Sequence, residues 1–128
     1  MRAVRIDEMQ RRNLLSRCEA AAGQAWLGDW LECGRSMAAA AIERRTGCAL
    51  DDPDVMRSAA RARLRQAVFA LDGEQSPTFR VARAVVIEDR TAAEVSGELG
   101  IRPGSATDLL RLGLRRLAER VYRFTESA

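Results

Sequence analysis

The stretch Thr91-Ala-Ala-Glu-Val-Ser-Gly-Glu-Leu-Gly-Ile-Arg-Pro-Gly-Ser105 decides how the last third of the chain folds. Thr91 and Glu94 have the spacing of a capping box, in which the hydroxyl accepts from the Glu94 amide and the carboxylate reaches back to the Thr91 amide. Gly100 ends this short helix, because glycine adopts the left-handed conformation without a Cβ clash. The residues between Gly100 and Ser105 then form a turn, and Ser105 is expected to cap a second, longer helix.

The longer helix is expected to continue to about Arg123, and one of its faces is apolar. Ile101 is expected to fill the core between the two helices. A short helix, a tight turn containing glycine and a longer helix with a buried inner face make up the helix-turn-helix arrangement. The apolar face, whose members recur at helical spacing, comprises Ala106, Leu110, Gly113, Leu117 and Val121.

A helical projection places a second set of side chains opposite this apolar face. Arg111 can bind a guanine edge or a phosphate, and Thr107 can contact a base or the backbone. Arg102 and Arg116 are better placed for phosphates, and the amides at the start of the helix can hold one. The sequence therefore predicts a DNA-contacting surface of Thr91, Arg102, Ser105, Thr107, Asp108, Arg111, Arg115 and Arg116.

Two residues of the longer helix depart from a purely DNA-reading surface. Asp108 adds an acid to the reading face, and Leu112 projects away from the apolar face. An exposed leucine indicates either packing against a neighbouring helix or a patch that binds a protein partner. Trp26 and Trp30 are expected in the core, so the N-terminal helices are one candidate to cover Leu112. A polymerase or a second copy of the chain is another.

Three helices are expected before Gly73. The first covers Ile6 to Ala22 with Asp7 as its N-cap, and the second covers Ala25 to Arg45. The third begins at the start signal Asp51-Asp52-Pro53-Asp54. Its outer face carries arginines at four-residue spacing, which fit a solvated face, a phosphate contact or a partner contact. These arginines are Arg57, Arg61 and Arg65.

The composition of the 128 residues favours an all-α fold, since 47% are hydrophobic and only 5% are aromatic. The loop from Gly73 to Pro77 separates an N-terminal helical bundle of about three helices, residues 1–73, from a DNA-binding region, residues 78–128. A helix over Phe79 to Glu88 opens the second region. The two regions form either separate units or one compact domain.

The charges of the chain are evenly spread, and all 21 basic residues are arginines. Before Gly73 there are 12 arginines against 10 acidic residues, and after it 9 against 8. DNA binding must therefore come from the placement of charge, because neither half is a polycation. No apolar stretch has the length that a membrane span needs, so we expect a cytoplasmic, nucleoid-associated protein without membrane contact.

The residue types that carry metal and catalytic chemistry are scarce. Cys18, Cys33 and Cys48 occur without histidine or a CxxC pair, so no metal site or cofactor is expected. Their odd number, with no signal peptide, predicts free and mostly buried thiols in a reducing compartment. The paired acids Asp51/Asp52 and Glu88/Asp89 stand at helix borders, where capping explains them. We expect no enzymatic activity.

The segment from Thr91 through Leu110 to Leu117 resembles region 4 of bacterial sigma factors, especially those of the extracytoplasmic-function type. The shared features are the Leu-Gly-Ile turn, the Pro-Gly before the long helix and the late leucine. The resemblance implies binding of promoter DNA and contact with RNA polymerase. A complete sigma factor also needs a region 2 that melts DNA, and 128 residues are too few to contain it.

A second resemblance reaches further along the chain. Leu110-Arg-Leu-Gly-Leu-Arg-Arg-Leu-Ala118, followed by Tyr122, together with Ala60-Arg-Ala-Arg-Leu-Arg65, is similar to a helical domain of alphaproteobacterial regulators. These include activators of gene transfer agents, which are domesticated phage-like clusters. The resemblance implies transcription activation, or antitermination through polymerase. Two alternatives remain open: the small subunit of a phage terminase, and a polymerase-binding or sigma-binding module that does not use DNA. Whether the chain is a monomer or a dimer is also left open.

Overall fold

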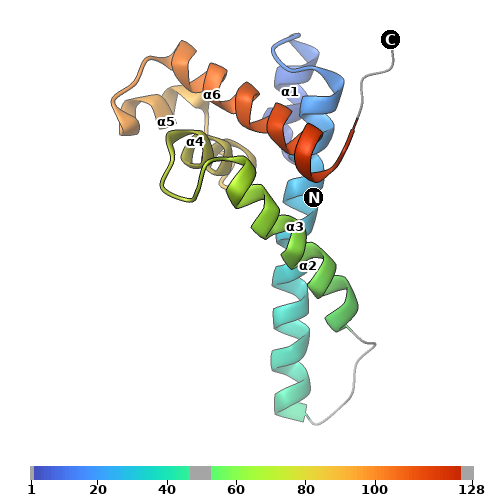
Figure 1. Cartoon of the computed structure of the whole chain (residues 1–128). Coiled ribbons are helices and arrows are strands. Elements are labelled where there is room, and N and C mark those ends of the chain that lie inside the picture. The colour runs from blue at the N-terminus through green and yellow to red at the C-terminus, as the bar shows by residue number, and fades with distance from the viewer. Residues whose placement is uncertain (1, 47–52, 125–128) are drawn as a thin grey trace.

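The structure is a computed structural model that describes the backbone of residues 2–46 and 53–124 and the side chains of residues 2–33 and 59–124. The described residues form helices joined by turns and loops, with no strand among them, which confirms the all-α prediction for this part of the chain. Figure 1 shows α2 and α3 extending side by side on one side of the molecule, while α1, α4 and α6 pack against the first half of α2 and α5 packs on α4 and α6. The elements are α1 (Val4–Arg11), α2 (Arg17–Thr46), α3 (Pro53–Ala70), α4 (Pro77–Val86), α5 (Ala92–Leu99), α6 (Pro103–Arg116) and the π-helical turn η1 (Leu117–Val121).

The first two helices differ from the prediction. The expected helix over Ile6 to Ala22 is interrupted after Arg11, and α2 runs from Arg17 to Thr46 without stopping at Gly23. The break follows from a capping box that the prediction missed. Ser16 Oγ accepts from the Glu19 amide at 3.1 Å, and Glu19 Oε1 accepts from the Ser16 amide at 2.7 Å. We call residues 12–16, between α1 and α2, the elbow.

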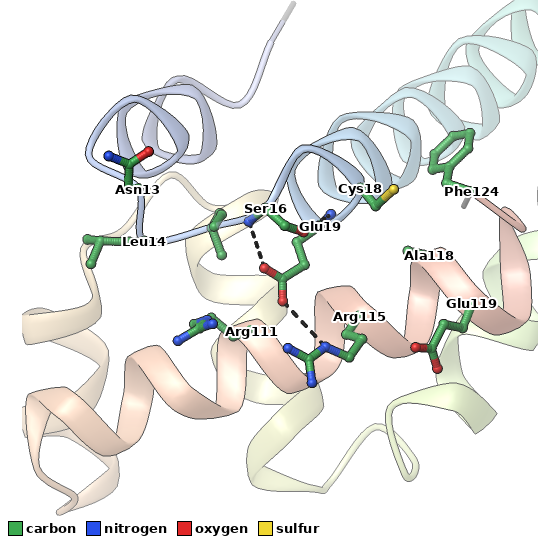
Figure 2. A pocket seen from close by; sticks show the side chains of 11 residues that line it. Asn13, Leu14, Ser16, Cys18, Glu19, Arg111, Arg115, Ala118, Glu119 and Phe124 are labelled. Carbon is green, nitrogen blue, oxygen red and sulfur yellow. Dashed lines mark hydrogen bonds and ion pairs between the residues drawn. The ribbon is translucent and has the colours of Figure 1, made fainter. Parts of the chain in front are cut away.

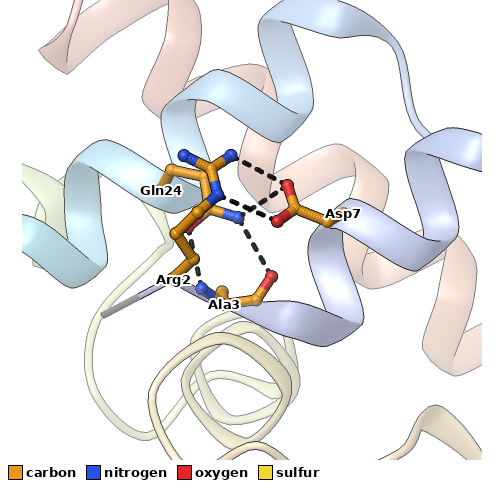
Figure 3. A network of polar contacts seen from close by, with 4 residues as sticks. All are labelled: Arg2, Ala3, Asp7 and Gln24. Atoms are coloured by element: carbon orange, nitrogen blue, oxygen red, sulfur yellow. Dashed lines mark hydrogen bonds and ion pairs between the residues drawn. The ribbon is translucent and has the colours of Figure 1, made fainter.

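Asp7 is not the N-cap of α1, because Ala3 occupies that position. Asp7 instead lies in the first turn and accepts hydrogen bonds from Arg2 at 2.9 Å and from Gln24 Nε2 at 3.1 Å (Figure 3). Gln24 also bonds to both backbone groups of Ala3, at 2.8 and 3.0 Å. The hydrogen bond from Arg2 lowers the pKa of Asp7. This network ties the start of α1 to α2.

The third and fourth helices begin at prolines. α3 starts at Pro53, as its start signal predicts, whereas Asp51, Asp52 and Cys48 lie outside the described residues, as does the side chain of Arg57. α4 starts at Pro77, where Ser76 Oγ accepts from the Phe79 amide at 3.1 Å. The helix ends at Val86, two residues before the predicted end at Glu88.

A single hydrophobic core takes residues from both sides of Gly73. Trp26 is only 1% exposed, which confirms its predicted place in the core. Its ring meets Phe79 and Trp30 edge to face, with centroids 5.9 and 6.4 Å apart. The largest side chains that the core seals completely include Ile6, Leu71, Val85, Leu110, Leu114 and Leu117.

A group of hydrogen bonds ties α3, and the residue that follows η1, to Asp29 of α2. Asp29 is 8% exposed and accepts two hydrogen bonds from Arg63 of α3, both at 2.7 Å. The hydroxyl of Tyr122 donates a third bond to Asp29, at 2.7 Å. Burial and then this bond raise the pKa of Tyr122 far above its ordinary value. Tyr122 reaches Asp29 just after η1, where its amide donates to the Leu117 carbonyl at 2.9 Å, five residues back.

Among the described helices, none is both long and apolar enough to cross a membrane.

Candidate nucleic-acid interface

The start of α5 shows half of the predicted capping box. Thr91 Oγ1 accepts from the Glu94 amide at 3.2 Å, as predicted. The Glu94 carboxylate instead lies 3.7 Å from Arg90 Nε, in an exposed ion pair. At the other end, Gly100 has φ +70°, and the Ile101 amide donates to the Ser96 carbonyl at 2.9 Å. This confirms that Gly100 ends the helix in the left-handed conformation.

The start of α6 differs from the prediction, because Ser105 does not cap the helix. Arg102 occupies the N-cap position with an extended backbone and no capping side chain, and Pro103 is the first helical residue. A proline at this position has a preset φ and lacks an amide that would need a partner, so the helix begins two residues before Ser105. Ser105 therefore lies within the first turn, and its side chain is exposed.

The inner face of α6 is sealed. Ala106, Leu110 and Leu117 are fully buried, as the helical spacing predicts, and Val121 is half-buried. Leu114, one helical turn after Leu110, is also fully buried. At Gly113 a Cβ would lie 2.9 Å from Leu71 Cδ2 and 3.1 Å from Thr78 Cγ2. Glycine thus allows α6 to approach the corner between α3 and α4.

The outer face of α6 carries most of the predicted DNA-contacting side chains. Thr107 is half-buried, and its hydroxyl donates to the Pro103 carbonyl at 3.3 Å. Arg116 is half-buried in an ion pair with Asp72, so it is not free on the surface. Leu112 remains 40% exposed, so the described N-terminal helices leave it uncovered. The exposed members of the predicted set are Arg102, Ser105, Asp108, Arg111 and Arg115.

The elbow stands beside this face, which the sequence analysis did not predict. A hollow of about 790 Å³ separates the elbow and the start of α2 from the second half of α6. Figure 2 shows Arg111 and Arg115 extending from α6 toward Leu14 and Glu19 on its other side. Arg111 and Arg115 also line a shallower hollow of about 210 Å³ with Asp108 and Leu112.

Glu19 links the elbow to α6. Glu19 is 2% exposed, and its Oε2 atom is buried without a hydrogen-bond partner. The nearest cation is Arg115, whose Nε lies 3.8 Å from Oε2 and whose side chain is 58% exposed. The spacing of Ser16 and Glu19 could have revealed this site, because it repeats the Thr-x-x-Glu pattern at Thr91.

The sulfur and carboxylate groups of the described residues form no cluster of three or more that could hold a metal ion. Cys18 and Cys33 are free and half-buried rather than fully buried. Comparisons of the chain with models of protein families, with curated proteins and with solved structures gave no match.

Proposed function

We propose that this chain binds duplex DNA through a helix-turn-helix formed by α5, the turn after Gly100 and α6, and that it regulates transcription on or with RNA polymerase. One observation carries the DNA part of the proposal. The inner face of α6 is sealed in the core, while the opposite face is exposed at Arg102, Asp108 and Arg111. A recognition helix needs this division, since one face must be braced while the other enters the major groove.

The arginines of the outer face differ in their ion pairs. Arg116 is bonded to Asp72, and Arg115 lies beside the buried carboxylate of Glu19. Arg102 and Arg111 are exposed and have no ion pair with a described acid. In the proposal, Arg111 binds a guanine edge or a phosphate, and Arg102 binds a phosphate at the start of α6.

The regulatory part of the proposal rests on the sequence resemblances. The Leu-Gly-Ile turn and the following Pro-Gly resemble region 4 of sigma factors, which implies promoter DNA and polymerase as partners. The similarity to regulators of gene transfer agents implies activation or antitermination in a phage-derived system. Nucleoid association in the cytoplasm and the absence of catalysis belong to the same proposal.

The test is a titration of fluorescent duplex DNA, selected by the parent protein from a random library, at several salt concentrations. We expect Arg111→Ala to weaken specific binding by roughly 1–3 kcal/mol, the range of a bidentate base contact. Arg80→Ala is the matched control, since Arg80 is an exposed arginine on α4. If Arg111→Ala binds like the parent, Arg111 is not a DNA contact.

A protein-binding module that does not use DNA is the second candidate. Its support is Leu112, which is 40% exposed beside Asp108 on the face expected to read DNA. An apolar and an acidic side chain suit a protein surface better than a phosphate backbone. A binding curve with duplex DNA that stays flat at low salt would favour this candidate over the first.

A further inference from the structure

A second hollow shares no lining residue with the one beside Glu19 and has a different chemistry. It has a volume of about 250 Å³ and lies between α2, α3 and α4. Its floor is apolar, and its rim carries three arginines and one acid. The floor consists of Trp30, Leu64, Val68 and Phe79, and the rim of Arg61, Arg65, Arg83 and Glu74. We call this feature the α3 groove.

The rim of the α3 groove has an excess of positive charge. Arg61 and Arg65 are exposed and have no ion pair with a described acid. Arg83 stacks over Trp30, with its guanidinium carbon 5.3 Å from the ring centroid, and its Nε lies 3.8 Å from Glu88. Two of the three guanidinium groups thus have no carboxylate partner among the described residues.

An exposed aromatic residue lies on α3, four residues beyond a rim residue of the groove. Phe69 follows Arg65 by one helical turn on α3, and it is 81% exposed, more than any other large apolar side chain of the described residues. Leu64 and Val68, on the groove floor, are half-buried. Apolar side chains that lie together at a surface and are rimmed by charge mark a protein-binding site.

We infer that the α3 groove binds an acidic amphipathic segment of a partner protein, with an apolar anchor in the hollow and carboxylates on Arg61 and Arg65. A DNA backbone fits less well, because phosphates gain nothing from an apolar floor. A symmetric dimer through this face also fits less well, because it would bring two arginine-rich rims together. The inference does not depend on DNA binding by α6.

The probe is a synthetic helix-forming peptide that contains leucines at one-turn spacing and glutamates elsewhere, with no aromatic residue. The readout is the emission of Trp30, which lines the groove, while Trp26 is buried in the core. We expect a saturable blue shift with this peptide. The same peptide with lysine in place of every glutamate should cause none, because like charges then face each other.

Variants of the whole chain locate the contact. The double variant Arg61→Glu/Arg65→Glu should weaken peptide binding by roughly tenfold or more, because it reverses the charge of the rim. Arg12→Glu, at an exposed arginine of the elbow, should leave it unchanged. Phe69→Ala should weaken binding severalfold, and it removes no core contact since Phe69 is exposed.

Three results would overturn the inference: equal peptide affinity in the parent and the double variant, a dimer that the double variant abolishes, or DNA binding that requires Arg61 and Arg65 without any peptide binding. The Arg111→Ala variant separates this inference from the DNA proposal. It should bind the acidic peptide like the parent, whatever its effect on duplex DNA.

Discussion

Two buried carboxylates on helix α2 are treated differently by the fold. Asp29 is 8% exposed and accepts three hydrogen bonds, from Arg63 and Tyr122. Glu19 is 2% exposed, yet one of its oxygens has no hydrogen-bond partner and only a cation at 3.8 Å. Both oxygens of Asp29, which joins α2 to α3, thus have hydrogen-bond partners. Glu19, which faces α6, keeps one oxygen without a partner.

The arginines that face these two acids differ in the same way. Arg63 is committed to Asp29 by two short bonds, and the Asp29 hydrogen bond raises its pKa. Arg115 has only a loose contact with Glu19, and its side chain is 58% exposed. Since a charge-assisted hydrogen bond requires close approach, Arg115 keeps most of its capacity for another anion.

The largest expected loss of stability comes from removing Asp29, the fully hydrogen-bonded carboxylate. Asp29→Ala leaves the Tyr122 hydroxyl and the Arg63 guanidinium without their acceptor, and we expect it to lower the free energy of unfolding by about 3 kcal/mol. Urea denaturation followed by circular dichroism measures this. Glu98→Ala is the control, because the Glu98 side chain is 59% exposed in its pair with Arg90 and the residue lies within helix α5. Equal losses in the two variants would contradict the comparison.

Tyr122→Phe removes one of the three bonds to Asp29 and should cost about 1.5–2 kcal/mol. It should also change the dependence of stability on pH. The pKa of Tyr122 is raised in the folded state, so its contribution is complete below the unfolded value of about 10 and is lost as the pH rises above that value. Denaturation between pH 8 and 11 should show a decline in the parent that is smaller in Tyr122→Phe. Parallel curves would contradict this role.

Substitutions of Glu19 separate its capping oxygen from its unbonded one. Glu19→Ala removes the acceptor of the Ser16 amide and should cost about 1 kcal/mol, as the loss of a helix cap does. Glu19→Gln keeps that acceptor and should change the free energy of unfolding by less than about 0.5 kcal/mol. Thermal and urea denaturation compare the two. A loss in Glu19→Gln as large as in Glu19→Ala would show that the charge itself is needed.

Asp7 is a more accessible carboxylate than Asp29 or Glu19. Its substitution should therefore give the smallest change in the free energy of unfolding. Its pKa is lowered, above all by the hydrogen bond from Arg2, and its side chain is 32% exposed. Asp7→Asn should therefore cost less than about 0.5 kcal/mol at neutral pH, after solvent screening. The lowered pKa adds stability above the unfolded value of about 3.9, and this is lost as the pH falls through the folded value. A difference between parent and variant that grows at low pH would contradict this assignment.

Local patterns predicted the C-terminal helices better than the N-terminal ones. Gly100 ends α5 because its left-handed conformation is a property of the residue itself, and the spacing around Leu110 predicted the sealed face of α6. The boundary between α1 and α2 was missed, although Ser16 and Glu19 have a capping pattern, because helical periodicity continues across the elbow. Ser105 was placed wrongly as a cap because Pro103 supplies a competing start signal.

The parts of the site that could not be predicted depend on contacts between distant residues. Projection of α6 placed Arg111 on the surface, where the structure has it, but could not show that Asp72 pairs with Arg116 across 44 positions. The bonds to Asp29 span 34 and 93 positions, and no local pattern marks such a carboxylate as buried. The DNA-contacting role of the outer face stays a prediction, because exposure alone does not define a ligand.

The π-helical turn at Leu117–Val121 sets a length constraint on the end of the chain. A turn of this kind accommodates one residue more than an α-helix does, and the residues beyond it are displaced by about 100° around the axis. Removing one residue there would restore the α-helical pitch and direct Tyr122 away from Asp29 while α6 stayed in place. Natural variation should therefore alter the amino acids of this turn more readily than their number.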